Sequence, residues 1–267
     1  MKAGDVIKLV CDKLGMANLP DGGFEVGTPE DRVEGILVTW LATPDALRYA
    51  VDNDFNLVVC HEELYWSERE DPPEYRSPGP YKKPQDWENH PNHVLEEIIR
   101  NGKLTVLRIH YGLDRLFIYD DFAKTMGMGQ VVAGNVYEKV YQLPRKMKLG
   151  ELIEQIKAKT GLNSIRYVGD ENQIIEKVGN GWGGVGLSGN RYYTRRAIQD
   201  GAQAIICGEI DEFAMFFVEQ CNTALVETSH VLSENRGLEH FAQYLGEVFA
   251  PVPCEFYKVE YPCKTFS

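Results

Sequence analysis

The sequence contains four short apolar runs, each of which ends at residues that can bind a metal ion. Runs that are mainly apolar are typical of strands buried on both faces of a parallel sheet. They cover residues 55–60, 103–109, 204–207 and 223–229. The metal-capable residues that follow them are His61 and Glu62, His110 and Asp114, Glu209, and His230 and Glu234. Because ligands gather beyond the carboxyl ends of the strands of an α/β sheet, we expect these side chains to converge on one crevice.

The N-terminal half contains a predicted βαβ unit. The near-continuous apolar segment 35–42 indicates a buried strand. Residues 43–45 combine a threonine cap, a proline suited to the first helical position and an acid in the first turn, which predicts a helix that ends near Asn53. Since the strand at 55–60 follows after a short loop, the two strands should pair in parallel.

Helices and strands also alternate in the second half. The predicted helices are 149–160, 190–200, 211–221 and 235–249, and the predicted strands are 164–168, 173–178, 203–207 and 223–229. Such an alternation is typical of an α/β fold. We therefore predict two related α/β lobes with largely parallel sheets and a metal site in the crevice between them. The first lobe would comprise residues 1–125 with 235–267, and the second would comprise residues 126–234.

The composition argues against several classes of partner. The 28 Lys and Arg residues are outnumbered by 40 Asp and Glu residues, and a surface with a formal charge of −12 repels phosphate backbones. No apolar stretch approaches the roughly 18 consecutive residues of a membrane span, and the N-terminus does not resemble a signal peptide. The six cysteines form no C-x-x-C pair, which is typical of reduced thiols. We expect a soluble cytoplasmic protein that binds neither nucleic acid nor membrane.

The predicted ligands have informative spacings. His230 and Glu234 are four residues apart, which places them on one face of a helix where they can chelate one ion or contact two. A surface pair without metal would have the same spacing. His61 and Glu62 point in opposite directions on an extended strand, but a turn at the strand end would let both approach a pair of ions. An ordinary charged loop is the alternative. Asp114 is able to bridge two cations.

Other segments have competing interpretations. Residues 66–92, rich in proline and charge, form either a lid over the crevice or a passive excursion. His90 and His93 are spaced like metal ligands, but an exposed loop pair is the favoured interpretation. The glycine-rich stretch 179–189 lacks a phosphate-loop motif, so chain flexibility or close backbone packing explains it better. Cys60 lies on a strand with no activating neighbour, which disfavours a cysteine nucleophile.

Taken in order, these motifs resemble the Nif-three-like family, the dinuclear metal centre proteins also known as GTP cyclohydrolase I type 2 homologues. Segment 22–27 resembles the family's G-L-x-V-G signature, 38–46 its strand and D-A-T-x-x-V helix start, and 60–66 its T-H-H-P-L-x-F motif. Residues 109–114 resemble A-H-x-x-L-D, 207–209 resemble T-G-E, and 229–234 resemble the closing G-H-x-x-x-E. The similarity spans nearly the whole chain.

The resemblance implies that His61, Asp114, His230 and Glu234 bind two divalent metal ions, with Asp114 or Glu234 as the bridge. Glu62 stands where the family has a second histidine. A carboxylate at this position favours Mn, Fe or Mg over Zn, although Zn stays a candidate. The paired histidines that usually follow the T-G-E segment are also missing from the sequence. The family forms toroidal hexamers, which implies a homo-oligomer.

The resemblance and the ligand set together predict a metal-dependent hydrolase that acts on a small molecule, either a nucleotide or another phosphoester-like substrate. Two bound cations lower the pKa of a water ligand and stabilise negative charge in the transition state. Glu209 or Glu62 would accept the proton, and His110 would orient the water or the substrate. The alternative, which the missing histidines favour, is a non-catalytic regulatory or scaffold protein that acts through an oligomeric surface. Metal storage or delivery is a third hypothesis.

Overall fold

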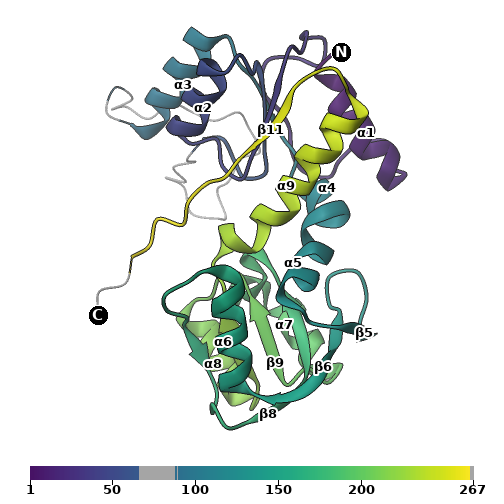
Figure 1. The fold of residues 1–267 in the computed structure, drawn as a ribbon, viewed down its shortest axis with the longest axis vertical. Helices are drawn as coiled ribbons and strands as arrows, with labels where there is room; N and C mark the ends of the chain where they lie inside the picture. Colours follow the sequence, from purple (N-terminus) through teal and green to yellow (C-terminus); the bar gives the residue numbers. More distant parts are fainter. Residues whose placement is uncertain (66–87, 89, 265–267) are drawn as a thin grey trace, which may run out of the picture. The chain divides into compact units, whose positions relative to one another are not determined.

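The computed structural model describes residues 1–65, 88 and 90–264 (Figure 1). The chain forms two compact units, and both are discontinuous in sequence. The first unit comprises Met1–Gly112 and Ala242–Tyr257, and the second unit comprises Leu113–Phe241 with Lys258–Ser267. The lobes predicted from the sequence instead had residues 113–125, 235–241 and 258–267 in the first lobe.

Within the described residues, the sheet of the first unit has five strands in the order β1-β4-β3-β2-β11. They are β1 (Gly23–Val26), β2 (Ile36–Thr39), β3 (Leu57–Cys60), β4 (Thr105–Arg108) and β11 (Cys254–Tyr257). Strands β4, β3, β2 and β11 are parallel to one another, whereas β1 pairs antiparallel with β4 at one edge. Every residue of β2 and β3 is buried, as the apolar runs predicted.

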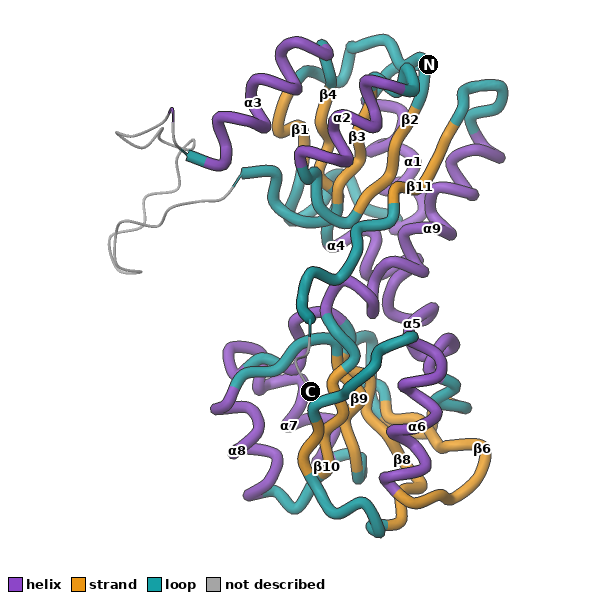
Figure 2. Tube along the Cα trace, turned by 60° about the vertical axis from the view of Figure 1, so that its left-hand side comes forward, coloured by secondary structure: helices purple, strands orange, loops and turns teal. Residues whose placement is uncertain are grey.

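Helices α2 (Pro44–Asp52) and α3 (Pro91–Gly102) cover one face of this sheet (Figure 2). Leu47 of α2 and Ile99 of α3 share a buried apolar cluster with Val58 of β3. Helix α2 begins where the sequence predicted, because Thr43 Oγ1 accepts a hydrogen bond from Ala46 N at 3.1 Å. The segment β2-α2-β3 is therefore the predicted βαβ unit. Helix α1 (Gly4–Leu14) also belongs to the first unit.

In the second unit, the described residues form a sheet of six strands in the order β5-β6-β8-β9-β10-β7. They are β5 (Gln130–Ala133), β6 (Val140–Lys148), β7 (Tyr167–Val168), β8 (Ile174–Gly181), β9 (Ala204–Cys207) and β10 (Ala224–Glu227). Only the central strands β8, β9 and β10 run parallel. The α/β class is confirmed, but this sheet is mixed rather than largely parallel. The reason is that β5 and β6 on one side and β7 on the other pair antiparallel.

Three helices of the second unit match the prediction closely: α6 (Leu149–Thr160), α7 (Arg191–Gln199) and α8 (Glu212–Gln220). The fourth, α9 (His230–Val248), begins at His230 rather than at residue 235. Ser229 has a positive φ of 81°, which turns the chain from β10 directly into the helix. Ser233 N donates to Ser229 O at 3.0 Å and closes the first turn. His230 and Glu234 consequently lie at the start of α9.

A helical segment that the sequence did not lead us to expect follows His110. Helix α4 (Tyr111–Leu113), a π-helical turn at Asp114–Ile118 and helix α5 (Tyr119–Met126) continue one another. π-Helical turns are rare in proteins, and those that occur often lie at functional sites. Helix α9 passes close to this turn within the second unit, since a Cβ atom at Gly237 would lie 2.5 Å from Ile118 Cα.

Most of the segment 66–92 lies outside the described residues, so its interpretation as a lid stays a prediction. Among the helices of the described part of the chain, none has both the length and the apolar character needed to cross a membrane.

Candidate metal-binding site

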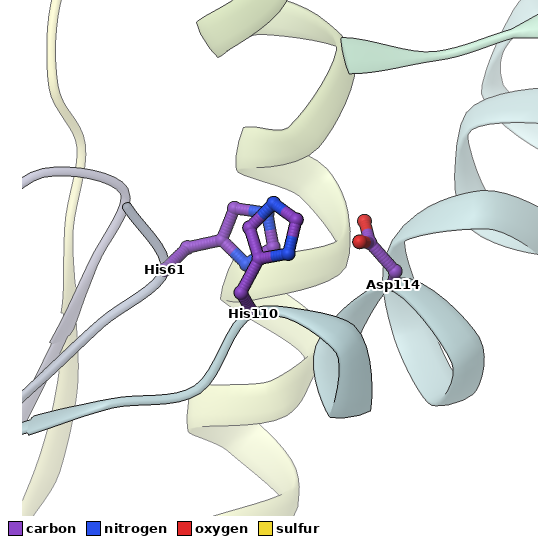
Figure 3. Close-up of side chains that lie close together, drawn as sticks. All are labelled: His61, His110 and Asp114. Atoms are coloured by element: carbon purple, nitrogen blue, oxygen red, sulfur yellow. The ribbon is translucent and has the colours of Figure 1, made fainter. Parts of the chain in front are cut away.

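The first unit brings His61 and His110 together beyond the carboxyl ends of two adjacent parallel strands, β3 and β4. Ile109 N donates to Cys60 O at 2.9 Å, so the backbones of the two strands stay paired just past the end of β4. The imidazole rings stack with their centroids 4.5 Å apart and an interplanar angle of 19° (Figure 3). His61 is fully buried, whereas the side chain of His110 is partly exposed.

In both rings, Nδ1 lies next to an oxygen atom. His61 Nδ1 is 3.2 Å from the carbonyl oxygen of Ile109, which can only accept, so Nδ1 carries the hydrogen. His110 Nδ1 is 2.9 Å from Asp21 Oδ2, and Asp21 Oδ1 accepts a hydrogen bond from Tyr111 N at 3.0 Å. Histidines that bind metals use this arrangement, because it orients the ring and directs Nε2 to the ion.

Asp21 is a candidate site residue that sequence reasoning missed. Residues 19–23 contain the run Asp-Gly-Gly, which is typical of a turn. Gly22 in this turn has a φ of +92°, and a Cβ atom there would overlap Arg108 O, so the position needs glycine. The close approach holds the turn against the end of β4, just before His110. The Asp-Gly-Gly run therefore signalled the turn, but not the histidine to which the aspartate would bind.

The second unit contributes His230 and Glu234, which lie on one face of α9. His230 Nε2 is 3.3 Å from Glu234 Oε1, and only 2% of the Glu234 side chain is exposed. His230 Nδ1 is 3.1 Å from Glu209 Oε2. The hydrogen bond to His230 lowers the pKa of the Glu209 carboxyl below its usual value. Glu209 therefore orients His230 as Asp21 orients His110.

Asp114 is the first residue of the π-helical turn, and it is buried. The indole Nε1–H of Trp182 donates a hydrogen bond to Asp114 Oδ1 at 2.8 Å. Trp182 lies between β8 and the short 3-10 helix Gly183–Gly186, inside the glycine-rich stretch 179–189. A Cβ atom at Gly183 would overlap Glu234 Oε1. Close backbone packing, one of the two interpretations of this stretch, therefore describes Gly183.

The described residues include groups of side chains that could hold a metal ion. Their members are His61, His110 and Asp114, drawn in Figure 3, together with Glu62 and Glu234. His230, the remaining predicted ligand, pairs with Glu234. Glu63, which immediately follows Glu62, is exposed.

His90 and His93 do not form an exposed loop pair, so that interpretation is wrong. His90 is buried and caps helix α3, because its Nδ1 accepts a hydrogen bond from Asn92 N at 3.1 Å. His93 lies within α3, with its Nε2 4.0 Å from Glu97 Oε1. Cys60 is fully buried, and burial raises its pKa to about 12, which agrees with the prediction against a cysteine nucleophile.

The fold and these side chains define an α/β protein of two units that carries histidine–carboxylate clusters suited to metal binding. The sequence matches the Duf34/NIF3 (NGG1p interacting factor 3) family over residues 5–262, and the chain belongs to this family. The resemblance drawn from the motifs is thereby confirmed. A GTP cyclohydrolase 1 type 2 homolog from Clostridium perfringens is 23% identical over 252 residues, covering 88% of this chain and 87% of the relative. A protein of the same name from Clostridium acetobutylicum is 25% identical over 227 residues, covering 79% and 76%.

Solved structures show the same fold. Staphylococcus aureus protein SA1388 superposes with a TM-score of 0.78 at 16% identity, covering 100% of this chain and 99% of the other. A Bacillus cereus protein related to NIF3 also gives a TM-score of 0.78, at 13% identity and the same coverage. Reduced HcgD from Methanocaldococcus jannaschii gives a TM-score of 0.67 at 16% identity, covering 96% and 97%.

Proposed function

We propose that the chain binds two divalent metal ions through His61, Glu62, Asp114, His230 and Glu234. The observation that carries this proposal is the environment of the histidine rings. In His61 and His230, the two proposed imidazole ligands, Nδ1 lies 3.2 Å and 3.1 Å from an oxygen acceptor. This arrangement is typical of metal-binding histidines, because it fixes the orientation of the imidazole ring.

The donor set suits a hard or borderline divalent ion. Three of the five proposed ligands are carboxylates, which favour Mn, Fe or Mg, whereas the two imidazoles also suit Zn. Glu234 is buried next to an imidazole, and Asp114 is buried next to an indole N–H. Burying carboxylates is costly unless they are paired, and a divalent cation would offset that cost.

The proposed activity is hydrolysis of a nucleotide or another phosphoester-like substrate. When bound, the ions would lower the pKa of a water ligand and offset negative charge that develops on the substrate. His110 would accept a proton at Nε2 while Asp21 holds Nδ1–H and stabilises the imidazolium. Glu209, whose carboxyl pKa is lowered by His230, would keep His230 oriented rather than serve as the base. Glu62 stays a candidate proton acceptor. The names of the two clostridial relatives support a nucleotide.

A non-catalytic metal-binding regulatory or scaffold protein is the second candidate. The observation that favours it is Glu62 itself, because this position holds a histidine in the family motif. Loss of an imidazole alters the affinity of a site for borderline metals. Such a protein would act through an oligomeric surface and would keep its metals without turnover.

Metal content per chain, measured by inductively coupled plasma mass spectrometry, tests the proposal. We expect about two ions per wild-type chain after purification without chelator, and fewer in both His61→Ala and Glu234→Ala. His93→Ala is the matched control, because His93 lies on helix α3 and is not a proposed ligand. An empty wild-type protein that also fails to take up Mn, Fe or Zn would contradict metal binding.

Turnover separates the two candidate functions. The metal-loaded protein would be incubated with panels of nucleotides and phosphodiesters, with Asp114→Ala as the inactive variant. Metal-dependent hydrolysis that Asp114→Ala abolishes supports the hydrolase. Full metal occupancy without turnover across the panels supports the scaffold.

A further inference from the structure

We infer that Trp182 and Gly183 are positioning residues that set the geometry of the metal ligands in the second unit. This inference rests on the proposed function for the identity of the ligands, but it concerns residues to which the family motifs assign no role. Two consecutive residues contact Asp114, His230 and Glu234: Trp182 through its indole N–H, and Gly183 through a backbone that carries no side chain.

Trp182 fixes the carboxylate of Asp114. Its Nε1–H donates to Oδ1 at 2.8 Å, which orients the carboxylate. The indole is itself held firmly, because it is 5% exposed and contacts two tyrosine rings. The ring of Tyr119 lies edge-on at 4.6 Å and that of Tyr137 lies tilted at 4.9 Å, centroid to centroid. A Phe side chain would keep most of this packing and lose only the donor.

The backbone of Trp182 is also restrained from the side of β8. Trp182 N donates to Asn180 Oδ1 at 3.2 Å. Asn180 Nδ2 in turn donates to Tyr119 O at 2.9 Å, which ties the turn to the first residue of α5. Trp182 is thus bonded to both ends of one helical segment, to Asp114 at the start of the π-helical turn and, through Asn180, to Tyr119 just after it.

Gly183 lets the backbone lie directly against the ligands on α9. Its φ is +52°, and a Cβ atom would overlap Glu234 Oε1 and lie 3.1 Å from His230 Nε2. Gly183 N donates to Ser233 Oγ at 2.8 Å, and Ser233 Oγ donates to His230 O at 2.6 Å. These bonds attach the glycine turn to the first turn of α9.

The carbonyl of Gly183 extends the same contact to Glu209. Glu209 N donates to Gly183 O at 2.9 Å, and the Glu209 carboxylate is the partner of His230 Nδ1. The turn is therefore bonded to the helix that carries two ligands and to the residue that orients one of them.

The test uses Co²⁺ as the probe, because its visible absorption spectrum reports the number and geometry of its ligands. Affinity would be measured by competition with a chromophoric chelator on the full chain, and thermal melts of the metal-free protein would report folding. We expect Trp182→Phe to weaken Co²⁺ binding about 10- to 100-fold and to change the Co²⁺ spectrum. Gly183→Ala should do the same.

Two variants serve as matched controls. Gly189→Ala lies in the same glycine-rich stretch, where a Cβ atom would meet nothing within 4 Å. Tyr193→Phe removes a polar atom from a ring that lies 6.3 Å from Tyr137 in the same aromatic cluster. Both should bind Co²⁺ like the wild type. If Gly183→Ala does not fold, Trp182→Phe decides alone.

The outcomes separate this inference from the proposed function. A wild-type chain that binds neither Co²⁺ nor Mn, Fe or Zn would overturn both. A wild-type chain that binds Co²⁺, together with a folded Trp182→Phe variant of the same affinity and spectrum, would overturn the positioning role and leave the proposed function standing.

Discussion

His110 Nδ1 lies 2.9 Å from Asp21 Oδ2, although 89 positions separate the two residues in the sequence. The glycine turn that carries Asp21 sits against the end of β4, and the aspartate also accepts a hydrogen bond from Tyr111 N. One carboxylate thus orients both the imidazole and the backbone that follows it. A histidine held in this way can exchange a proton at its other nitrogen without rotating.

Removal of this carboxylate should change the tautomer of His110. In the metal-free wild type, we expect neutral His110 to carry its hydrogen on Nδ1, because the Asp21 carboxylate only accepts. In Asp21→Ala, the tautomer with the hydrogen on Nε2 should gain population. Nitrogen-15 NMR of the imidazole rings measures this ratio. His61, whose Nδ1 faces the Ile109 carbonyl, is the internal control and should keep its tautomer. An unchanged His110 would contradict the orienting role of Asp21.

Replacement of Glu62 by histidine should shift metal preference toward Zn. An imidazole at this position restores the family motif and is a better ligand for Zn than for Mn. We expect Glu62→His to raise the Zn-over-Mn affinity ratio by about tenfold, which corresponds to about 1.4 kcal/mol. Competition titrations with both metals provide the ratio. Glu63→His is the matched control, because Glu63 is the exposed neighbour. Equal shifts in the two variants would argue against Glu62 as a ligand.

Cys60 should be chemically inert in the folded protein. Burial raises its pKa to about 12, so almost no thiolate forms at about pH 8. Iodoacetamide at that pH should label exposed Cys263 and leave Cys60 unmodified, as read by mass spectrometry of peptides. Both cysteines should react once the chain is unfolded. Rapid labelling of Cys60 in the native protein would revive the cysteine nucleophile.

Asp31 should make the first unit sensitive to acid. Its carboxylate accepts hydrogen bonds from Thr28 N at 2.9 Å and from Thr28 Oγ1 and Thr105 Oγ1 at 2.8 and 2.7 Å. These bonds lower its pKa below 3.8. A lowered folded-state pKa contributes stability that is fully present above the unfolded pKa and is lost as the pH falls through the folded value.

The measurement is urea unfolding of wild type and Asp31→Asn at about pH 6 and about pH 2.5. The wild type should be the more stable protein at the higher pH, and the difference between the two free energies of unfolding should shrink in acid. Asp45→Asn, on the exposed first turn of α2, is the control. A difference that does not depend on pH would rule out the carboxylate hydrogen bonds as its cause.

The sequence predicted the elements whose signals are local. Thr43 and Pro44 mark the start of α2, and the apolar runs mark β3 and β9, because capping and double-sided burial depend on neighbours along the chain. The start of α9 was missed, since the positive φ of Ser229 is not a preference that serine shows in sequence. Strands β5 and β6 were missed as well, because neither is an all-apolar run.

The residues of the candidate site also differ in whether a local sequence signal reveals them. His61, His110 and His230 follow strands and were found from that position. Asp21 and Trp182 were not, since each acts through a partner that is distant in sequence and neither residue type signals a ligand in its own segment. Glu209 was found, but its contact with His230 Nδ1 could only come from the structure.

The π-helical turn at Asp114–Ile118 spaces its hydrogen bonds five residues apart, one more than the four of an α-helix. Deletion of one residue from this turn would restore a regular α-helix. The residues that precede the deletion in the helix would then be rotated by about 100° relative to α5. Asp114 would then leave Trp182, and a neighbour would take its place. The length of this helical segment, and not the aspartate alone, therefore sets which side chain meets Trp182.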